Sequence, residues 1–175
     1  MTAATRSIIT VLGFDVGARR IGVAVGNAVS ATARDLAVVD MRDEVADWPA
    51  IDKLLREWRP DALVIGDPRT LVDGDQPSRQ RAQRFARDAY TRYGLPVRLV
   101  DERSSSIEAA QRFADARAAG ARKRTDARNL DALAAAVIVE RWLAAPNDSD
   151  SVSDSDAPSS SDPSSSDPSP TNVVP

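Results

Sequence analysis

One acidic residue interrupts an apolar segment near the start of the chain. Residues 8–16 are otherwise largely apolar, and residues 21–25 are apolar again, so the two segments predict a β-hairpin with Asp15 inside its first strand. A carboxylate among β-branched neighbours loses hydration, and it then becomes neutral, pairs with a base or binds a cation. The alternative is a plain turn, in which Asp15 bonds its own backbone and Gly17 takes a positive φ. Asp15 is therefore the first candidate metal ligand.

Two further acids stand where expected elements begin or end. Asp131 lies in an expected helix over residues 129–145 and faces the core, because it shares an apolar stripe with Ala134, Ala135, Ile138 and Trp142. Glu102 directly follows an expected parallel strand over residues 97–101, which places it at the carboxyl edge of the sheet. Taken singly, each acid also has an ordinary explanation: the helix dipole favours an acid in the first turn, and Glu102 could belong to a surface turn.

Asp15, Glu102 and Asp131 gain meaning if the fold brings them together. Like charges at short range repel one another unless cations neutralise them. Two Mg²⁺ or Mn²⁺ ions about 4 Å apart would neutralise the cluster and activate water for in-line attack on a phosphodiester. The chain has neither Cys nor His, which excludes thiolate nucleophiles, Cys/His zinc sites and Ser-His-Asp triads. Two-metal chemistry needs neither residue type.

The elements that must position these acids alternate between strands and helices. After the hairpin we expect a strand at 31–39, a helix opened at 47–49 and stopped at 60–61, a strand at 62–66, a polar loop at 67–76, a helix at 77–93 and the strand at 97–101. The continuous apolar sequence of 62–66 favours parallel pairing with helices on both faces. The polar loop follows the carboxyl end of that strand, where ligands bind in open α/β sheets.

Composition divides the chain of 175 residues into two parts. Residues 147–175 consist mainly of Ser, Asp and Pro, with six Asp and without Lys, Arg or aromatic residues. Such a segment cannot bury enough apolar surface to offset its ordering entropy. We therefore expect residues 1–146 to form one domain and residues 147–175 to be a disordered acidic tail.

The charge of the chain changes sign once the tail is removed. The whole chain has 23 basic and 26 acidic residues, a formal charge of -3; removing the six tail aspartates leaves 20 acids, so the body carries +3. Its basic loops, Arg19-Arg20 and Arg122-Lys123-Arg124, could contact phosphates or simply be solvated. The first ten residues do not resemble a secretory signal, and no stretch approaches about 18 apolar residues. We expect a soluble, intracellular protein without membrane contact.

The order of hairpin strands, carboxylates and helices is that of the ribonuclease H-like fold, and specific motifs resemble one family with this fold. The motifs are Gly13-Phe14-Asp15-Val16-Gly17, Arg20-Ile21-Gly22-Val23-Ala24-Val25, Ala33-Arg34, Asp73-Gly74, Asp101-Glu102-Arg103 and Leu130-Asp131-Ala132-Leu133-Ala134-Ala135. From about Ile9 to Leu143 they resemble the YqgF family, also called the RuvX or pre-16S rRNA nuclease family.

This resemblance implies an α/β fold with a mixed five-stranded sheet and helices on both faces. It also implies a bacterial cytoplasmic nuclease, similar in fold to Holliday-junction resolvases and linked to maturation of the 5′ end of 16S ribosomal RNA. Carried over by position, it makes Asp15, Glu102 and Asp131 the catalytic, metal-binding carboxylates, with two Mg²⁺ or Mn²⁺ ions expected. The expected nucleic-acid contacts are Arg19, Arg20, Arg103, Arg122, Lys123 and Arg124.

The chain departs from the family pattern at two points. Asp67 stands where an apolar residue usually follows the strand-end glycine, and Ser104-Ser105-Ser106 replaces the usual Leu or Phe followed by hydroxyl residues. Both departures concern loop shape and substrate contacts rather than the carboxylate set. The acidic tail is also absent from the family pattern, and the simplest expectation for it is a passive solubilising extension.

Other functions share parts of this pattern. Sugar kinases and actin-like ATPases use the same hairpin, but they resemble two copies of the fold, and 146 residues supply one; Gly17 to Gly22 is also no P-loop, because Val23-Ala24 follows it. Two alternatives stay open: a Holliday-junction resolvase for branched DNA, which requires a dimer to cut symmetrically, and a non-catalytic RNA- or ribosome-binding module. The expected partner of the nuclease is pre-16S rRNA, free or within the ribosomal subunit, and the protein is expected to be a monomer or homodimer.

Overall fold

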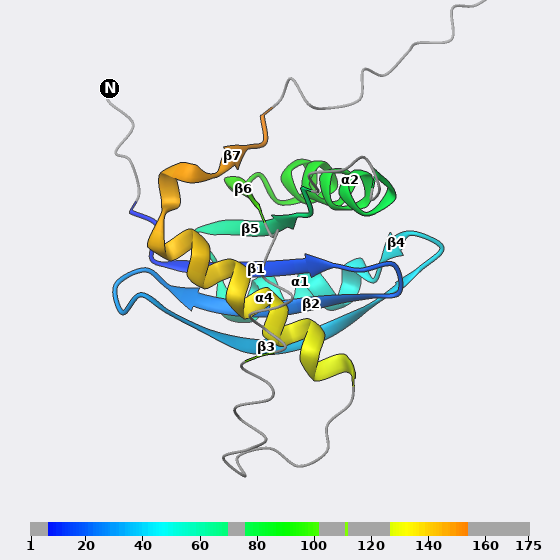
Figure 1. Cartoon of the computed structure of the whole chain (residues 1–175), viewed down its shortest axis with the longest axis horizontal. Coiled ribbons are helices and arrows are strands. Elements are labelled where there is room, and N and C mark those ends of the chain that lie inside the picture. The colour runs from blue at the N-terminus through cyan, green and yellow to red at the C-terminus, as the bar shows by residue number, and fades with distance from the viewer. Residues whose placement is uncertain (1–6, 70–75, 102–110, 112–126, 154–175) are drawn as a thin grey trace, which may run out of the picture.

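A single mixed sheet forms the centre of the molecule (Figure 1). The computed structural model describes residues 7–69, 76–101, 111 and 127–153, and within them seven strands lie in the order β4-β3-β2-β1-β5-β6-β7. The main strands are β1 (Thr10–Val16), β2 (Arg20–Asn27), β3 (Thr32–Arg42), β5 (Ala62–Asp67) and β6 (Val97–Asp101). Two short edge strands, β4 (Val45–Ala46) and β7 (Asp150–Ser151), add to the five that we expected.

The strands pair in both directions, as expected. β1 is antiparallel to β2, and β2 is antiparallel to β3, whereas β1, β5 and β6 run parallel to one another. Parallel strands need long crossover connections, and helices lie in both of them. These helices are α1 (Trp48–Trp58) and α2 (Gln76–Tyr93); α4 (Ala127–Ala144) and the short 3₁₀ helix η2 (Pro146–Asp148) come after β6.

Local sequence explains where the helices begin and end. The Asp47 side chain caps α1 by accepting a hydrogen bond from the backbone N–H of Ala50, at 3.2 Å. Arg59 ends α1 in the left-handed conformation, and Pro60 then prevents the helix from continuing. Gly94 follows α2 with a φ of 62°, a conformation that glycine adopts without steric cost. These boundaries lie within a few residues of the predicted ones.

Alternate residues of β1 face different helices. Leu12 and Phe14 belong to a buried apolar cluster with residues of α1 and α2. Val11 belongs to a second cluster with residues of α4, and Gly13 also lies against α4. The same alternation places Asp15 on the α4 face. Figure 1 shows α4 crossing in front of β1, β2 and β3, with α1 behind them, so helices cover both faces of the sheet as predicted.

The last helix is buried along most of its length. Residues 134–139 of α4 are all buried, in agreement with the nearly continuous apolar sequence. None of the helices in the described part of the chain is long and apolar enough to cross a membrane.

The first residues of the segment that we expected to be a disordered tail form a short strand at the edge of the sheet. Leu99 and Arg98 of β6 pair with Asp150 and Ser151 of β7, and Val152 packs against the apolar cluster of α1 and α2. The edge of β6 offers unpaired backbone groups, with which β7 pairs. An average over the whole tail composition hides this local feature. Residues 154–175 lie outside the described residues.

Candidate functional site

Asp15 lies within a strand and not in the hairpin turn. It is the last residue but one of β1, and it is the register partner of Gly22 on β2. The chain reverses at Gly17, whose N–H donates to the carbonyl oxygen of Arg20 at 2.9 Å, and Gly17 has no positive φ. The plain-turn alternative for Asp15 is therefore wrong, and the side chain projects from the sheet toward α4.

Glycine at position 22 allows α4 to approach the sheet directly beside Asp15. A Cβ atom on Gly22 would overlap the carbonyl oxygen of Asp131 and would lie 2.8 Å from the backbone nitrogen of Ala132. The first turns of α4 therefore rest on the β2 backbone at this point. Because Gly22 is the partner of Asp15 across the hairpin, the same contact brings Asp131 next to Asp15. The structure thus unites two of the three acids that the sequence singled out.

The small residues of β2 form a row beneath α4, which the sequence analysis did not use. Gly22, Ala24 and Gly26 alternate along β2, and Gly13 of β1 is the partner of Ala24. A Cβ on Gly13 would lie 3.3 Å from the carbonyl oxygen of Ala135 in α4. This alternation of small residues was the available signal that a helix packs closely on this face of the hairpin.

The electrostatics of the acid pair favour a cation. Burial, together with the nearby charge of Asp131, raises the pKa of Asp15 from 3.8 to about 6. Oδ2 of Asp131 is buried and has no hydrogen-bond partner, although the side chain as a whole is 30% exposed. Nε of Arg20 lies 2.8 Å from this oxygen as an ion pair, without hydrogen-bond geometry. Two neighbouring carboxylates with an unsatisfied oxygen are ligands of the type that hard divalent cations prefer.

The structure describes only some of the other predicted site residues. Arg19 is exposed in the hairpin turn, where its carbonyl oxygen accepts a hydrogen bond from Met41, and Arg20 is engaged with Asp131. Glu102, Arg103, Arg122, Lys123 and Arg124 lie outside the described residues. In the described part of the chain, no group of three acidic, His or Cys residues could hold a metal. The acid pair is therefore the described portion of the candidate site.

Comparison with known proteins identifies the family. The model of the family described as "RuvX: Holliday junction resolvase" matches residues 9–145, which is most of the chain. The chain belongs to the RuvX family. A relative from Xanthomonas axonopodis pv. citri, named "Putative pre-16S rRNA nuclease", is 64% identical over 138 residues, which cover 79% of this chain and 89% of the relative. A relative of the same name from Xanthomonas euvesicatoria pv. vesicatoria is 62% identical over 143 residues, 82% of this chain and 92% of the relative.

A solved structure supports the fold of this RuvX member. It is titled "T. thermophilus RuvC in complex with Holliday junction substrate" and has a TM-score of 0.50 at 18% identity, covering 82% of this chain and 99% of that chain. The predicted family and the ribonuclease H-like fold are therefore confirmed. Membership of the family makes the protein a nuclease, a hydrolase of phosphodiester bonds, as predicted.

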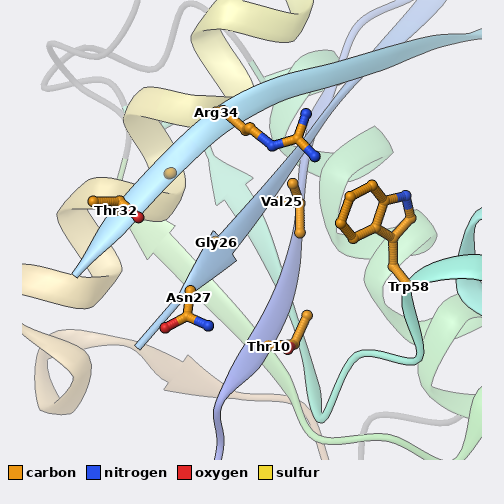
Figure 2. Close-up of a pocket in the computed structure, with 8 residues that line it drawn as sticks. Thr10, Val25, Gly26, Asn27, Thr32, Arg34 and Trp58 are labelled. Atoms are coloured by element: carbon orange, nitrogen blue, oxygen red, sulfur yellow. The ribbon is translucent and has the colours of Figure 1, made fainter. Parts of the chain in front are cut away.

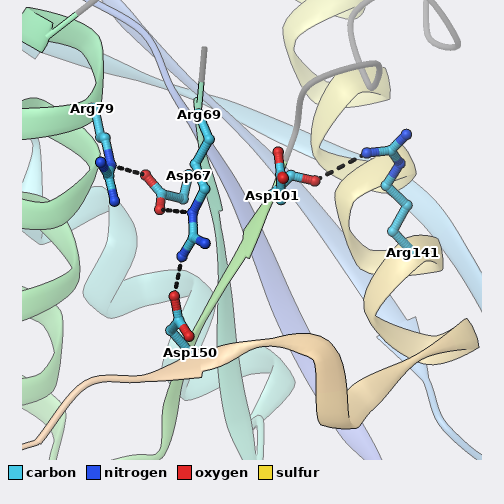
Figure 3. Close-up of polar contacts among 6 residues, drawn as sticks. All are labelled: Asp67, Arg69, Arg79, Asp101, Arg141 and Asp150. Atoms are coloured by element: carbon cyan, nitrogen blue, oxygen red, sulfur yellow. Dashed lines mark hydrogen bonds and ion pairs between the residues drawn. The ribbon is translucent and has the colours of Figure 1, made fainter. Parts of the chain in front are cut away.

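This RuvX member also has a polar cluster on the other face of the sheet, at Asp67 (Figure 3). Asp67 ends β5 and is fully buried; Nε of Arg69 donates to its Oδ2 at 2.9 Å, and Nε of Arg79 from α2 donates to its Oδ1 at 3.2 Å. Arg69 also pairs with Asp150 of β7. The sequence showed Asp67 as a departure from the family pattern. Its role in the structure is to join β5, α2 and β7.

Figure 3 also shows the end of β6 held against α4. A guanidinium nitrogen of Arg141 donates a hydrogen bond of 3.0 Å to the backbone carbonyl of Asp101, the last residue of β6. Asp101 is the register partner of Asp67, so β5 and β6 end together at one sheet edge.

The Asp67 cluster predicts that removal of its arginines and removal of its acid lower the stability by different amounts. Replacing both Arg69 and Arg79 by methionine should lower the free energy of unfolding by about 3 kcal/mol or more, because Asp67 would remain as an unpaired buried charge. Asp67→Leu should cost less than about 1 kcal/mol, because both arginines are partly exposed and can be hydrated. Urea unfolding of the two variants beside the wild type measures the difference, and equal losses would contradict this account.

Proposed function

We propose that this nuclease uses divalent metal ions held by Asp15 and Asp131 to mature the 5′ end of pre-16S ribosomal RNA. The observation that carries the metal site is the adjacent acid pair, in which the pKa of Asp15 is raised and Oδ2 of Asp131 is buried without a hydrogen-bond partner, with the Arg20 guanidinium as the nearby positive charge. Support for the substrate comes from relatives of more than 60% identity whose printed name includes pre-16S rRNA. Such a reaction would place the protein in the cytoplasm.

The residues of the chain have distinct roles in this proposal. Asp15 and Asp131 would bind the metal, with Glu102 as a third ligand, as the family resemblance implies; Mg²⁺ or Mn²⁺, in two sites, would supply charge stabilisation and an activated water. Asp15 binds a cation in its ionised form, which predominates above its pKa of about 6. The contact of Gly22 with α4 fixes the spacing of the two acids. Exposed Arg19, together with Arg103, Arg122, Lys123 and Arg124, would bind phosphates.

Arg20 would have a second role besides the predicted contact with nucleic acid. Its guanidinium already neutralises Asp131, so it competes with a metal ion for the same carboxylate. An Arg20→Gln variant should bind Mn²⁺ more tightly by up to about fivefold, because this change in affinity corresponds to the free energy of a partly exposed ion pair. Electron paramagnetic resonance of free Mn²⁺ measures this affinity, and Arg19→Gln is the matched control because Arg19 makes no ion pair with Asp131 in the described structure. Equal Mn²⁺ affinities of all three proteins would remove the competitive role.

Branched DNA is the second candidate substrate, because the matching family is described as Holliday junction resolvases. Two-metal hydrolysis acts on the phosphodiester that RNA and DNA share, so the acid pair does not discriminate between them. A resolvase would act as a homodimer on two symmetric strands, whereas a monomer suffices at an RNA end.

The deciding experiment compares both substrates under the same conditions. An end-labelled RNA that spans the 16S precursor 5′ end and a four-way DNA junction are incubated with wild-type protein and Mg²⁺ or Mn²⁺. Asp15→Asn serves as the control against contaminating nucleases. We expect cleavage of the RNA at the mature end and its loss in the variant. Cleavage of the junction alone would assign a resolvase, and RNA binding without cleavage would assign a binding module.

A further inference from the structure

A cavity of about 380 Å³ lies at the opposite end of β1 from the acid pair (Figure 2). Thr10, the first residue of β1, lines it together with the end of β2, the start of β3 and Trp58, the last residue of α1. Asp15 lies five positions along β1 from Thr10, a span of about 17 Å. The volume is in the range of small-molecule sites, so the cavity can hold one organic ligand of modest size.

An aromatic ring and a guanidinium form one wall of this cavity. The Arg34 guanidinium lies over the Trp58 ring, with its central carbon 5.0 Å from the ring centroid. Arg34 is exposed and has no ion pair with any residue in the described ranges, so its N–H groups remain available. Planar rings and guanidinium groups are the surfaces on which proteins stack unpaired nucleobases. The wall therefore suits a flat, electron-rich ligand.

Asn27 supplies oriented donors at the other side of the cavity. Its Oδ1 accepts hydrogen bonds from the backbone N–H groups of Val29 and Ser30, at 2.9 and 3.0 Å, which fixes the orientation of the amide. The amide nitrogen then faces the side of Thr10, as Figure 2 shows. None of the residues that line the cavity is acidic, and Arg34 is the charged residue among them. A ligand with a flat ring and an anionic group would meet complementary chemistry at both ends.

We propose that this cavity binds one unpaired nucleotide, with its base against Trp58 and Arg34 and its phosphate near Asn27. The site is separate from the acid pair, because the cavity lies at the Thr10 end of β1 and Asp15 lies near the other end of this strand. Where the nucleotide is part of an RNA strand, the inference rests on the proposed function. The cavity then anchors a single-stranded flank of the substrate at a distance from the cleaved bond. A free nucleotide offers the same chemistry.

The test measures binding without catalysis. AMP, adenosine and a short single-stranded RNA are titrated into the full-length protein in EDTA, with isothermal calorimetry as the readout. The variants are Arg34→Gln and Trp58→Leu, and Arg42→Gln is the matched control because it removes another exposed arginine of the same strand. Circular dichroism checks that each variant is folded. We expect Arg34→Gln to weaken AMP or RNA binding by about tenfold and Arg42→Gln to change it less than twofold.

The ligands separate the two sources of the nucleotide. RNA that binds much more tightly than AMP, with both dependent on Arg34, assigns the site to the substrate strand; equal affinities assign it to a free nucleotide. Weaker binding of adenosine than of AMP is expected from the phosphate contact. Binding that does not depend on Arg34 overturns the inference, even if the protein cleaves RNA. Conversely, failure to cleave RNA leaves the AMP measurement intact, so the two proposals fail separately.

Discussion

The nuclease activity of an Asp15→Asn variant should be more than about 100-fold lower than that of the wild type. Above pH 6 the variant should nevertheless unfold at a higher temperature than the wild type. The loss of activity follows from the proposed ligand role. Even the mutation of a group that only hydrogen-bonds to a metal ligand typically lowers metal affinity or activity by about 10–100-fold. The gain in stability follows from the position of Asp15 beside Asp131, where an ionised carboxylate is partly desolvated and repelled. Opposite effects on activity and stability are typical of a strained functional group.

The sign of the pH dependence can be derived from the pKa of Asp15. Folding raises this pKa from 3.8 to about 6, so the folded state binds the proton more tightly than the unfolded state. The resulting stabilisation is complete below pH 4 and is lost as the pH rises through 6. At pH 8 the ionised wild type is therefore less stable by about 1–3 kcal/mol, and asparagine does not have this cost.

Thermal unfolding at pH 5 and pH 8 in EDTA measures the effect. The stability difference between Asp15→Asn and the wild type should appear mainly at pH 8, and millimolar Mg²⁺ should stabilise only the wild type. Asp40→Asn is the matched control, because Asp40 is an exposed acid whose partner Arg128 is also exposed. A variant that is less stable than the wild type at pH 8 would contradict the strained-pair account.

Gly22→Ala should lower the free energy of unfolding by about 2–4 kcal/mol and reduce cleavage together with stability. The added methyl group would overlap the Asp131 carbonyl, which is backbone and cannot move as a flexible side chain can. Relief of the overlap requires α4 to move away from β2, and this movement separates Asp131 from Asp15. Stabilisation by Mg²⁺ should therefore also decrease in the folded variant.

Gly94→Ala provides a glycine control that does not involve the site. A Cβ at Gly94 meets no atom within 4 Å, so its cost comes only from the positive φ and should be about 1 kcal/mol. Urea unfolding and Mg²⁺-dependent thermal shifts of both variants separate steric from conformational effects. If Gly22→Ala were as stable as Gly94→Ala, the close approach of α4 would not control the site.

Local patterns in the sequence were sufficient to predict the elements and the fold class. The two apolar segments, the first of them interrupted by Asp15, predicted the hairpin, and Asp47, Pro60 and Gly94 marked helix boundaries that the structure confirms. These signals depend on residues within one or two turns of a helix or along one strand, and they act before the chain has folded. Motif order then sufficed to predict the family.

The tertiary structure alone decided which groups meet. Asp131 reaches Asp15 because α4 packs on the glycine backbone of Gly22, and Arg20 forms an ion pair with Asp131. The same holds for Arg34 over Trp58, and for β7, which a composition average had assigned to a disordered tail. Such contacts join residues distant in the chain, and their formation depends on how whole elements pack and on which sheet edge is exposed. The sequence determines these contacts only through the folded structure, because no local pattern contains both partners.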